Sequence, residues 1–324
     1  MSMKITIVAG LVAALAFAWG VQAKPVTAEV SAQVVSTDQF LKHDAIYPGG
    51  VSAHPDITYS TIPGYRSMTL DLYAPAKGKA ARPLVIYIHG GGWTGGNARN
   101  AGAFTDFPAV LASLAARGYV VASLNYRLSG EAKFPAAADD VDAAIRWLKG
   151  HAAGYGIDKT RVAVWGGSAG GQLAGLAATD CTAASGGKDS DCVQAAVIWY
   201  GVFDFAALPQ RPAPAGQPDA PNAYLGCRIA DCPAVVKAAS PIDHVDAKTP
   251  PTLLIYGSED KTVPPAQSRA MAAKLKAAGV RSESIEIPGV DHSFIGHTPE
   301  ATREASLRAL QATFDWFDAT VGRR

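Results

Sequence analysis

Short apolar runs recur along the chain at intervals typical of an alternating α/β protein. Near the start, residues 57–59 and 68–73 alternate apolar and polar side chains, which predicts an antiparallel hairpin of half-buried strands. Later runs are continuously apolar, as expected of parallel strands that are buried on both faces. These runs cover residues 84–88, 119–124, 162–165, 195–199, 252–256 and, less strongly, 284–287.

Stretches with apolar residues at helical spacing separate most of these runs. They cover residues 101–117, 136–151, 169–179, 265–278 and 300–321. Strands and helices in alternation predict a mostly parallel central sheet with right-handed crossovers. We therefore expect an α/β protein whose sheet is flanked by helices, with the antiparallel hairpin at its N-terminal edge.

The first 23 residues follow a different pattern. Lys4 precedes an apolar run over residues 5–19, and the segment ends in Val21-Gln22-Ala23, which is typical of a signal-peptidase site. We expect a signal peptide over residues 1–23, and hence a secreted or periplasmic protein. A transmembrane anchor is the alternative, but the run is short for a membrane span.

The remaining chain divides at about residue 56. Residues 24–55 are polar and irregular, and we expect an N-terminal extension there. Residues 56–324 then form one α/β domain. Its proline-rich segment, within residues 203–236, is expected to be an insertion near the carboxyl edge of the sheet, where open α/β sheets bind ligands. A surface loop or a linker is the alternative.

Composition and charge narrow the possible partners. The chain is 48% hydrophobic, carries a formal net charge of +1 and has no run of Lys or Arg. There is enough apolar material for a sizeable core, and no basic surface that indicates nucleic acid. We expect no nucleic-acid partner and no stable membrane anchor.

Four cysteines lie in one part of the chain, as two close pairs. In an exported protein they predict the local disulfides Cys181–Cys192 and Cys227–Cys232, although four cysteines allow three connectivities. A zinc site is the rival interpretation, disfavoured by the uneven spacing.

The segment 166–170, with the sequence GGSAG, matches the pattern G-x-S-x-G. It lies directly between the apolar run 162–165 and the helical stretch 169–179. This strand–turn–helix context defines a nucleophile elbow, which presents the serine hydroxyl at a helix N-terminus. We predict that Ser168 is a catalytic nucleophile. The alternative is a glycine-rich turn with an incidental serine.

The sequence HGGGW, residues 89–93, follows the run 84–88. Acyl transfer needs preorganised N–H donors for an oxyanion, and glycines let the backbone approach the substrate. We assign the donors to Gly91, Gly92 and, after the nucleophile, Ala169; which of Gly91, Gly92 and Trp93 donate within the loop stays open. We expect the ring of Trp93 to contact substrate, or alternatively only to pack the loop. We expect His89 to have a structural role and to support this loop.

A serine nucleophile needs a general base after it in the chain. Only three histidines follow Ser168. His292 lies in a loop between the run 284–287 and the last helix, where the base belongs. His244 precedes its strand and so lies at the wrong edge, and His297 is the second choice.

The base in turn needs a carboxylate that orients it. Asp260 follows the run 252–256 directly and is our prediction. Asp204, which follows the preceding strand, is the rival. Glu259 and Asp291 are expected to be solvated.

Beyond the elbow and the HGGGW loop, five further motifs point to a family. They are NYRL at 125–128, FPA at 134–136, DDV at 139–141, SPI at 240–242 and GSED at 257–260. From about residue 56 to residue 320 the chain resembles bacterial esterases of the α/β-hydrolase fold, especially the bifunctional acetylxylan and feruloyl esterases. It resembles hormone-sensitive-lipase-like carboxylesterases more distantly. The resemblance implies a structural ion pair between Arg127 and Asp140.

These features together predict an exported serine carboxylic-ester hydrolase. The resemblance implies an acyl-enzyme on Ser168 and short-chain or plant-derived acetyl or feruloyl esters, either small or polysaccharide-linked, with no cofactor and no metal. A kynurenine-formamidase-like amidase is one alternative. A non-catalytic binding protein of the same fold is another, although that class usually loses the nucleophile.

Overall fold

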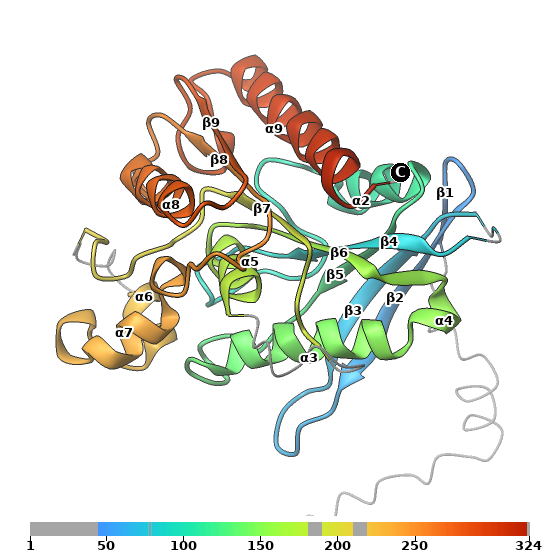
Figure 1. Cartoon of the computed structure of the whole chain (residues 1–324), viewed down its shortest axis with the longest axis horizontal. Coiled ribbons are helices and arrows are strands. Elements are labelled where there is room, and N and C mark those ends of the chain that lie inside the picture. The colour runs from blue at the N-terminus through green and yellow to red at the C-terminus, as the bar shows by residue number, and fades with distance from the viewer. Residues whose placement is uncertain (1–44, 77, 79, 181–189, 210–218, 323–324) are drawn as a thin grey trace, which may run out of the picture. The chain divides into compact units, whose positions relative to one another are not determined.

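The computed structural model describes residues 45–322, apart from residues 77, 79, 181–189 and 210–218 (Figure 1). The expected signal peptide, residues 1–23, lies outside the described residues. So does Cys181, and the pairing Cys181–Cys192 therefore remains a prediction.

A nine-stranded sheet runs through the described residues, in the order β1-β2-β3-β5-β4-β6-β7-β8-β9. Neighbours from β5 to β9 in this order are parallel, whereas β1, β2, β3 and β5 pair antiparallel. The α/β-hydrolase fold is confirmed, with β2 and β3 as the predicted hairpin. The strands are β1 (Ala45–Tyr47), β2 (Val51–Ser60), β3 (Met68–Ala74), β4 (Arg82–Ile88), β5 (Val120–Leu124), β6 (Ile157–Gly167), β7 (Ala195–Trp199), β8 (Thr252–Gly257) and β9 (Ser282–Ile287).

The sheet begins earlier than the sequence predicted. Part of the segment 24–55, expected to be irregular, forms β1 and the first half of β2. The register of β2 against β3 shifts between His54 and Ile57, and Asp56 has a φ of 55° in that bulge. Because the bulge interrupts the apolar–polar alternation, the period-two pattern is recognisable only from Ile57 onwards.

Helices cover both faces of the sheet (Figure 1). One apolar cluster, on the face covered by α2 (Phe107–Ala116) and α9 (Pro299–Thr320), is separated by the sheet from a second. The second lies under α3 (Ala136–Gly150), α5 (Ala169–Thr179) and α8 (Pro265–Ala277). Shorter elements are α4 (Ala152–Tyr155), α6 (Ala220–Leu225), α7 (Pro233–Ala239), η2 (Ile229–Asp231), η3 (Pro241–Asp243) and η4 (His292–Phe294).

The helix predicted over residues 101–117 is shorter in the structure. α2 begins at Phe107, because the carboxylate of Asp106 accepts the N–H of Ala109 at 3.1 Å and Pro108 occupies the first turn. Residues 101–106 instead form a loop, in which Gly102 has a φ of 47°.

A buried ion pair ties the segment after β5 to α3. Arg127 and Asp140 approach to 2.8 Å with 11% and 2% of their side chains exposed, and a second guanidinium nitrogen also contacts the carboxylate. Such a two-pronged pair fixes geometry as well as charge. The pairing implied by the family resemblance is confirmed.

The described part of the segment 203–236 lies beside the HGGGW loop. Its rings of Phe205 and Tyr224 pack against Trp93, with ring centroids 5.4 and 4.6 Å away. The predicted disulfide Cys227–Cys232 links η2 to the end of α6. These contacts hold the segment at the carboxyl edge of the sheet.

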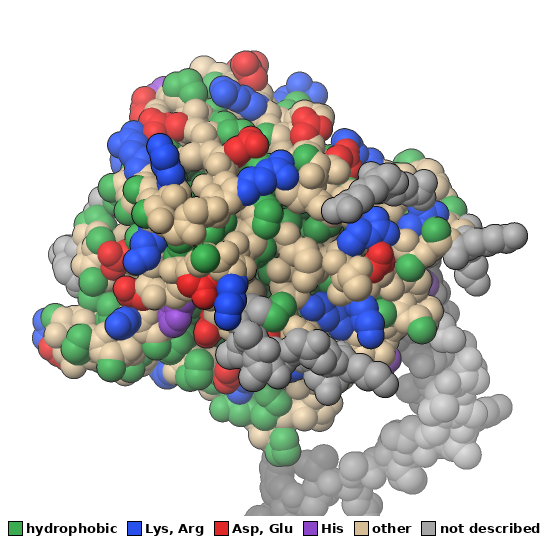
Figure 2. Space-filling view, in the orientation of Figure 1, with side chains coloured by type: hydrophobic (Ala, Val, Ile, Leu, Met, Phe, Trp, Pro, Cys, Tyr) green, Lys and Arg blue, Asp and Glu red, His purple; other side chains and the backbone are tan. Residues whose placement is uncertain are grey.

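Charged side chains of both signs are intermixed over the face seen in Figure 2. This distribution agrees with the near-neutral net charge. Within the described ranges, no helix combines the length and hydropathy required to cross a bilayer.

Asp142, a half-buried carboxyl group on α3, has a raised pKa. Burial raises the pKa of Asp142 on α3 to about 7, and the negative charge of Asp191 adds to the effect while Arg146 opposes it. The folded chain therefore retains a proton that an unfolded aspartate, with its ordinary pKa of about 3.9, has already released. The protonated Asp142 carboxyl therefore contributes to the free energy of unfolding at low pH, and this contribution is lost as the pH rises towards 7.

Asp142→Asn should remove this loss, because asparagine carries no proton to release. We expect the variant to be more stable than the parent at pH 8, by about 1–3 kcal/mol, and nearly equal to it at about pH 4. Urea unfolding at the two pH values measures the difference. Asp243→Asn, at an exposed position, is the control, and an equal gain at both pH values would contradict the explanation.

Candidate active site

Ser168 lies in a tight turn between β6 and α5. Its φ is 57°, a strained value for a residue with a side chain. The turn has no room for side chains on either side. A Cβ at Gly166 would lie 2.2 Å from the carbonyl oxygen of Gly170, and one at Gly170 would lie 2.1 Å from that of Ile88. The G-x-S-x-G pattern is thus required by the packing of the elbow.

Three side chains from separate loops form one hydrogen-bonded row. His292 Nε2 is 2.9 Å from Ser168 Oγ, and His292 Nδ1 is 2.8 Å from Asp260 Oδ2. The carboxylate of Asp260 is fully buried, and its other oxygen accepts two main-chain N–H groups, from Thr262 and Val263. The structure therefore brings together the serine, histidine and aspartate predicted from the sequence.

The other candidates for base and acid are engaged elsewhere. His297 is 78% exposed and pairs with Glu259 at 3.1 Å, so Glu259 is not simply solvated. The Nε2 atom of His244 bonds to a main-chain carbonyl oxygen in its own segment. The carboxylate of Asp204 accepts a main-chain N–H three residues further on.

Asp291 has a structural role that the sequence did not predict. One of its carboxylate oxygens accepts the N–H groups of Lys261, at 2.8 Å, and of His292, at 2.7 Å. It therefore joins the loop of Asp260 to the loop of His292. The hydrogen bond from the Lys261 N–H is the main cause that lowers the pKa of Asp291. The only signal in the sequence was its position immediately before the predicted base.

The glycine loop turns back over the elbow. Gly91 and Gly92 have φ values of 112° and 59°, and a Cβ at Gly91 would lie 2.3 Å from the carbonyl oxygen of Gly95. Both glycines line the cavity at Ser168. Ala169 is the first residue of α5, where a helix has N–H groups without helical partners. This is the arrangement expected of an oxyanion hole.

His89 supports this loop from below. Its ring stacks on Tyr126 with centroids 4.3 Å apart, and its Nδ1 lies 2.7 Å from the carbonyl oxygen of Gly90. Burial lowers the pKa of His89 to about 4. The ring is therefore neutral near pH 7, which agrees with the bracing role predicted for it.

Trp93 does not face the cavity. It is only 3% exposed, and its ring stacks on Tyr224 while its Nε1 donates to the side chain of Gln172 at 2.9 Å. The expected substrate contact is therefore not supported. The alternative, that Trp93 packs the loop, agrees with these contacts.

A cavity of 410 Å³ opens at the row of three side chains. Its deep end is marked by Tyr87 and Tyr200, which are 2% and 3% exposed. None of the aromatic residues between 203 and 225 belongs to its lining. The lining comprises Tyr87, Gly90, Gly91, Gly92, Gly96, Asn100, Ala101, Gly102, Phe104, Gly167, Ser168, Tyr200, Thr262, His292 and Ser293.

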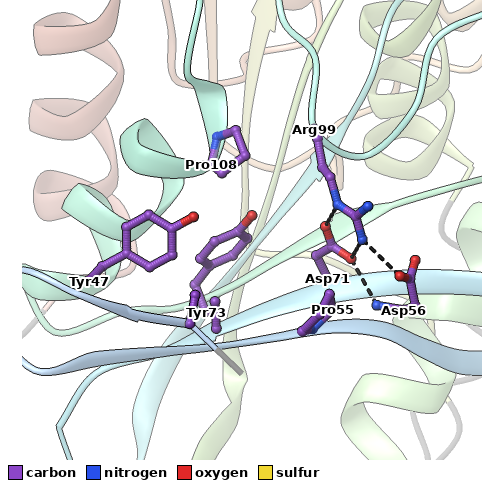
Figure 3. A pocket seen from close by; sticks show the side chains of 9 residues that line it. Tyr47, Pro55, Asp56, Asp71, Tyr73, Arg99 and Pro108 are labelled. Atoms are coloured by element: carbon purple, nitrogen blue, oxygen red, sulfur yellow. Dashed lines mark hydrogen bonds and ion pairs between the residues drawn. The ribbon is translucent and has the colours of Figure 1, made fainter. Parts of the chain in front are cut away.

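An ion cluster holds the outer side of the loop that lines this cavity. Arg99 bonds to the buried carboxylate of Asp71 at 2.7 Å and to Asp56 at 2.9 Å, beside a smaller pocket that also contains Tyr73 (Figure 3). The next residue, Asn100, lines the catalytic cavity on the inner side. The pair with Asp71 thus fixes one wall of the cavity from behind.

In the part of the chain that the structure describes, no group of three or more His, Cys, Asp or Glu side chains could hold a metal ion.

The fold, the elbow and this hydrogen-bonded row define an α/β-hydrolase of the esterase type. A model of the BD-FAE family matches residues 70–275, and the chain belongs to this family.

Known relatives and solved structures agree with this assignment. Esterase LipQ of Mycobacterium tuberculosis is 34% identical over 83% of this chain and 63% of its own length. The chain spans between about half and two thirds of the length of the first curated relatives that it matches. A truncated carbohydrate esterase from gut microbiota has a TM-score of 0.68 at 27% identity, covering 86% of this chain and 97% of that one. An acetyl ester-xyloside bifunctional hydrolase from Caldicellulosiruptor lactoaceticus reaches 0.67 at 26%, covering 85% and 97%.

Asp260→Asn should lower kcat by about 10⁴, because an amide cannot hold the imidazole in the tautomer that accepts a proton from Ser168. Asp204→Asn is the matched control and should change kcat little, since its carboxylate only bonds within its own turn. Steady-state kinetics on an activated ester measure both. If Asp204→Asn lowered kcat more than Asp260→Asn does, the catalytic acid would be Asp204, which follows β7.

Proposed function

We propose that this protein is an exported carboxylic-ester hydrolase that acts through an acyl-enzyme on Ser168. The observation that carries the proposal is the row Ser168–His292–Asp260, which opens into a cavity lined by Gly91 and Gly92. The intact row argues against a non-catalytic binding protein of the same fold.

Each group in the row has a defined task in such a reaction. Ser168 Oγ attacks the ester carbonyl carbon while His292 Nε2 takes the hydroxyl proton, and the carbonyl oxygen becomes an oxyanion facing the N–H groups of Gly91, Gly92 and Ala169. The intermediate then expels the alcohol, which receives the proton from His292.

A water molecule completes the cycle. It attacks the acyl carbon with His292 again as the base, which releases the carboxylic acid and returns the proton to Ser168. Throughout, the buried carboxylate of Asp260 keeps Nε2 of His292 free to accept a proton and stabilises the imidazolium.

The substrates we propose are short acyl esters, including acetyl or feruloyl groups on plant polysaccharides. The family and the carbohydrate-esterase neighbours support this class. Export is supported by the signal-peptide pattern of residues 1–23 and by the Cys227–Cys232 disulfide, since disulfides persist in oxidising compartments.

Ser168→Ala should abolish turnover of p-nitrophenyl acetate and butyrate while the fold remains, because alanine cannot form an acyl-enzyme. Loss of the nucleophile costs roughly 10⁶ in kcat in a well-studied serine protease. Intact mass after treatment with diethyl p-nitrophenyl phosphate should show one added diethylphosphoryl group on the parent and none on the variant. Residual turnover well above the background that the oxyanion hole and substrate binding alone support, or modification of both proteins, would refute the nucleophile.

The substrate class is tested by comparing kcat/KM for methyl ferulate, acetylated xylan and p-nitrophenyl esters of increasing chain length. We expect turnover of the short esters and of at least one of the two plant-type substrates. A preference for octanoate or longer chains, with neither plant-type ester cleaved, would indicate a lipase-like carboxylesterase.

A further inference from the structure

A second cavity lies next to the catalytic one and shares one lining residue with it. The second cavity has a volume of 430 Å³ and lies between the loop 103–105 and the first turns of α9. Phe104 belongs to the lining of both cavities. The far wall of the second cavity includes Leu307, whose side chain is 44% exposed.

Phe104 is held firmly in this position. Its N–H bonds to the carbonyl oxygen of Ala101 at 3.1 Å, which closes a tight turn. Its ring packs against Phe107 and Trp199, with centroids 5.8 and 6.2 Å away. These contacts keep the ring from swinging freely, so it acts as a wall rather than as a loose flap.

The deep end of the catalytic cavity suits the acyl part of an ester. The alcohol leaves towards His292, which gives it a proton, and a polysaccharide alcohol is too large to fit within a 410 Å³ cavity that is partly open to solvent. The acyl group therefore extends inward, towards the buried rings of Tyr87 and Tyr200. The turn that carries Phe104 closes this end, because a Cβ at Gly102 would lie 3.1 Å from the hydroxyl of Tyr200.

We propose that Phe104 limits the length of the acyl group by separating the catalytic cavity from this second cavity. The inference rests on the proposed ester hydrolysis. Removal of the ring joins the two spaces, and the apolar wall at Leu307 then receives the distal methylene groups of a longer acyl chain.

The experiment compares Phe104→Ala with the parent on p-nitrophenyl acetate, butyrate, octanoate and decanoate. We expect Phe104→Ala to raise the decanoate-to-acetate ratio of kcat/KM by at least about tenfold, since each accommodated methylene discriminates strongly in an apolar pocket. Phe104→Leu, which leaves a smaller opening, should give an intermediate ratio and serves if the alanine variant is unstable.

A second substitution identifies the space that the chain enters. Leu307→Asp alone should leave the parent's profile unchanged, whereas combined with Phe104→Ala it should cancel the decanoate gain, because the chain would meet a charge. Tyr65→Ala is the matched aromatic truncation outside both cavities and should leave the ratio unchanged.

The outcomes separate the two proposals. Acetate turnover by the parent that is lost in Ser168→Ala supports ester hydrolysis independently of chain length. With that established, an unchanged ratio in a folded Phe104→Ala variant, or a gain that persists in the double variant, would overturn the role of Phe104. Acetate esters of longer alcohols should show no comparable gain, and a gain confined to them would also overturn it.

Discussion

The close contact between the start of α5 and the end of β4 is the constraint on which the candidate site depends. No side chain fits at Gly170, because the carbonyl oxygen of Ile88 occupies that space. This contact forces the turn before α5 to be sharp and holds Ser168 at a positive φ. It also brings the first N–H groups of α5 beside the HGGGW loop, which continues directly from β4. One packing constraint therefore sets the nucleophile and the proposed oxyanion donors together.

The three glycines of the loop that faces the elbow have no side chains to hold them, so the rings at the two ends of the loop, His89 and Trp93, anchor it. His89 rests on Tyr126, whose hydroxyl donates to the carbonyl oxygen of His89 at 2.9 Å. Trp93 is anchored through Gln172 and the rings of the segment 203–236. Rigid support of this kind lets main-chain donors serve an oxyanion without reorganising during the reaction.

The sequence predicted a mostly parallel sheet with an antiparallel hairpin, and it predicted the members of the hydrogen-bonded row, because both follow from local patterns. Buried parallel strands are continuously apolar, and Ser168 and Asp260 each follow such a strand. His292 follows the less apolar edge strand β9, at the same edge of the sheet. The prediction failed for features that depend on tertiary contacts. The bulge at Asp56 hid the first half of β2, and the inward packing of Trp93 depends on Tyr224, which is distant in the chain.

The carboxylate of Asp291 has a consequence for how such a site can be altered. Because it bonds to main-chain groups on both sides, the loops after β8 and β9 are mechanically one unit, although they are encoded 30 residues apart. Recombination or grafting that replaces one loop without the other would break this link and misplace the imidazole. These two loops are therefore expected to be inherited, and to be transplanted, only as a pair.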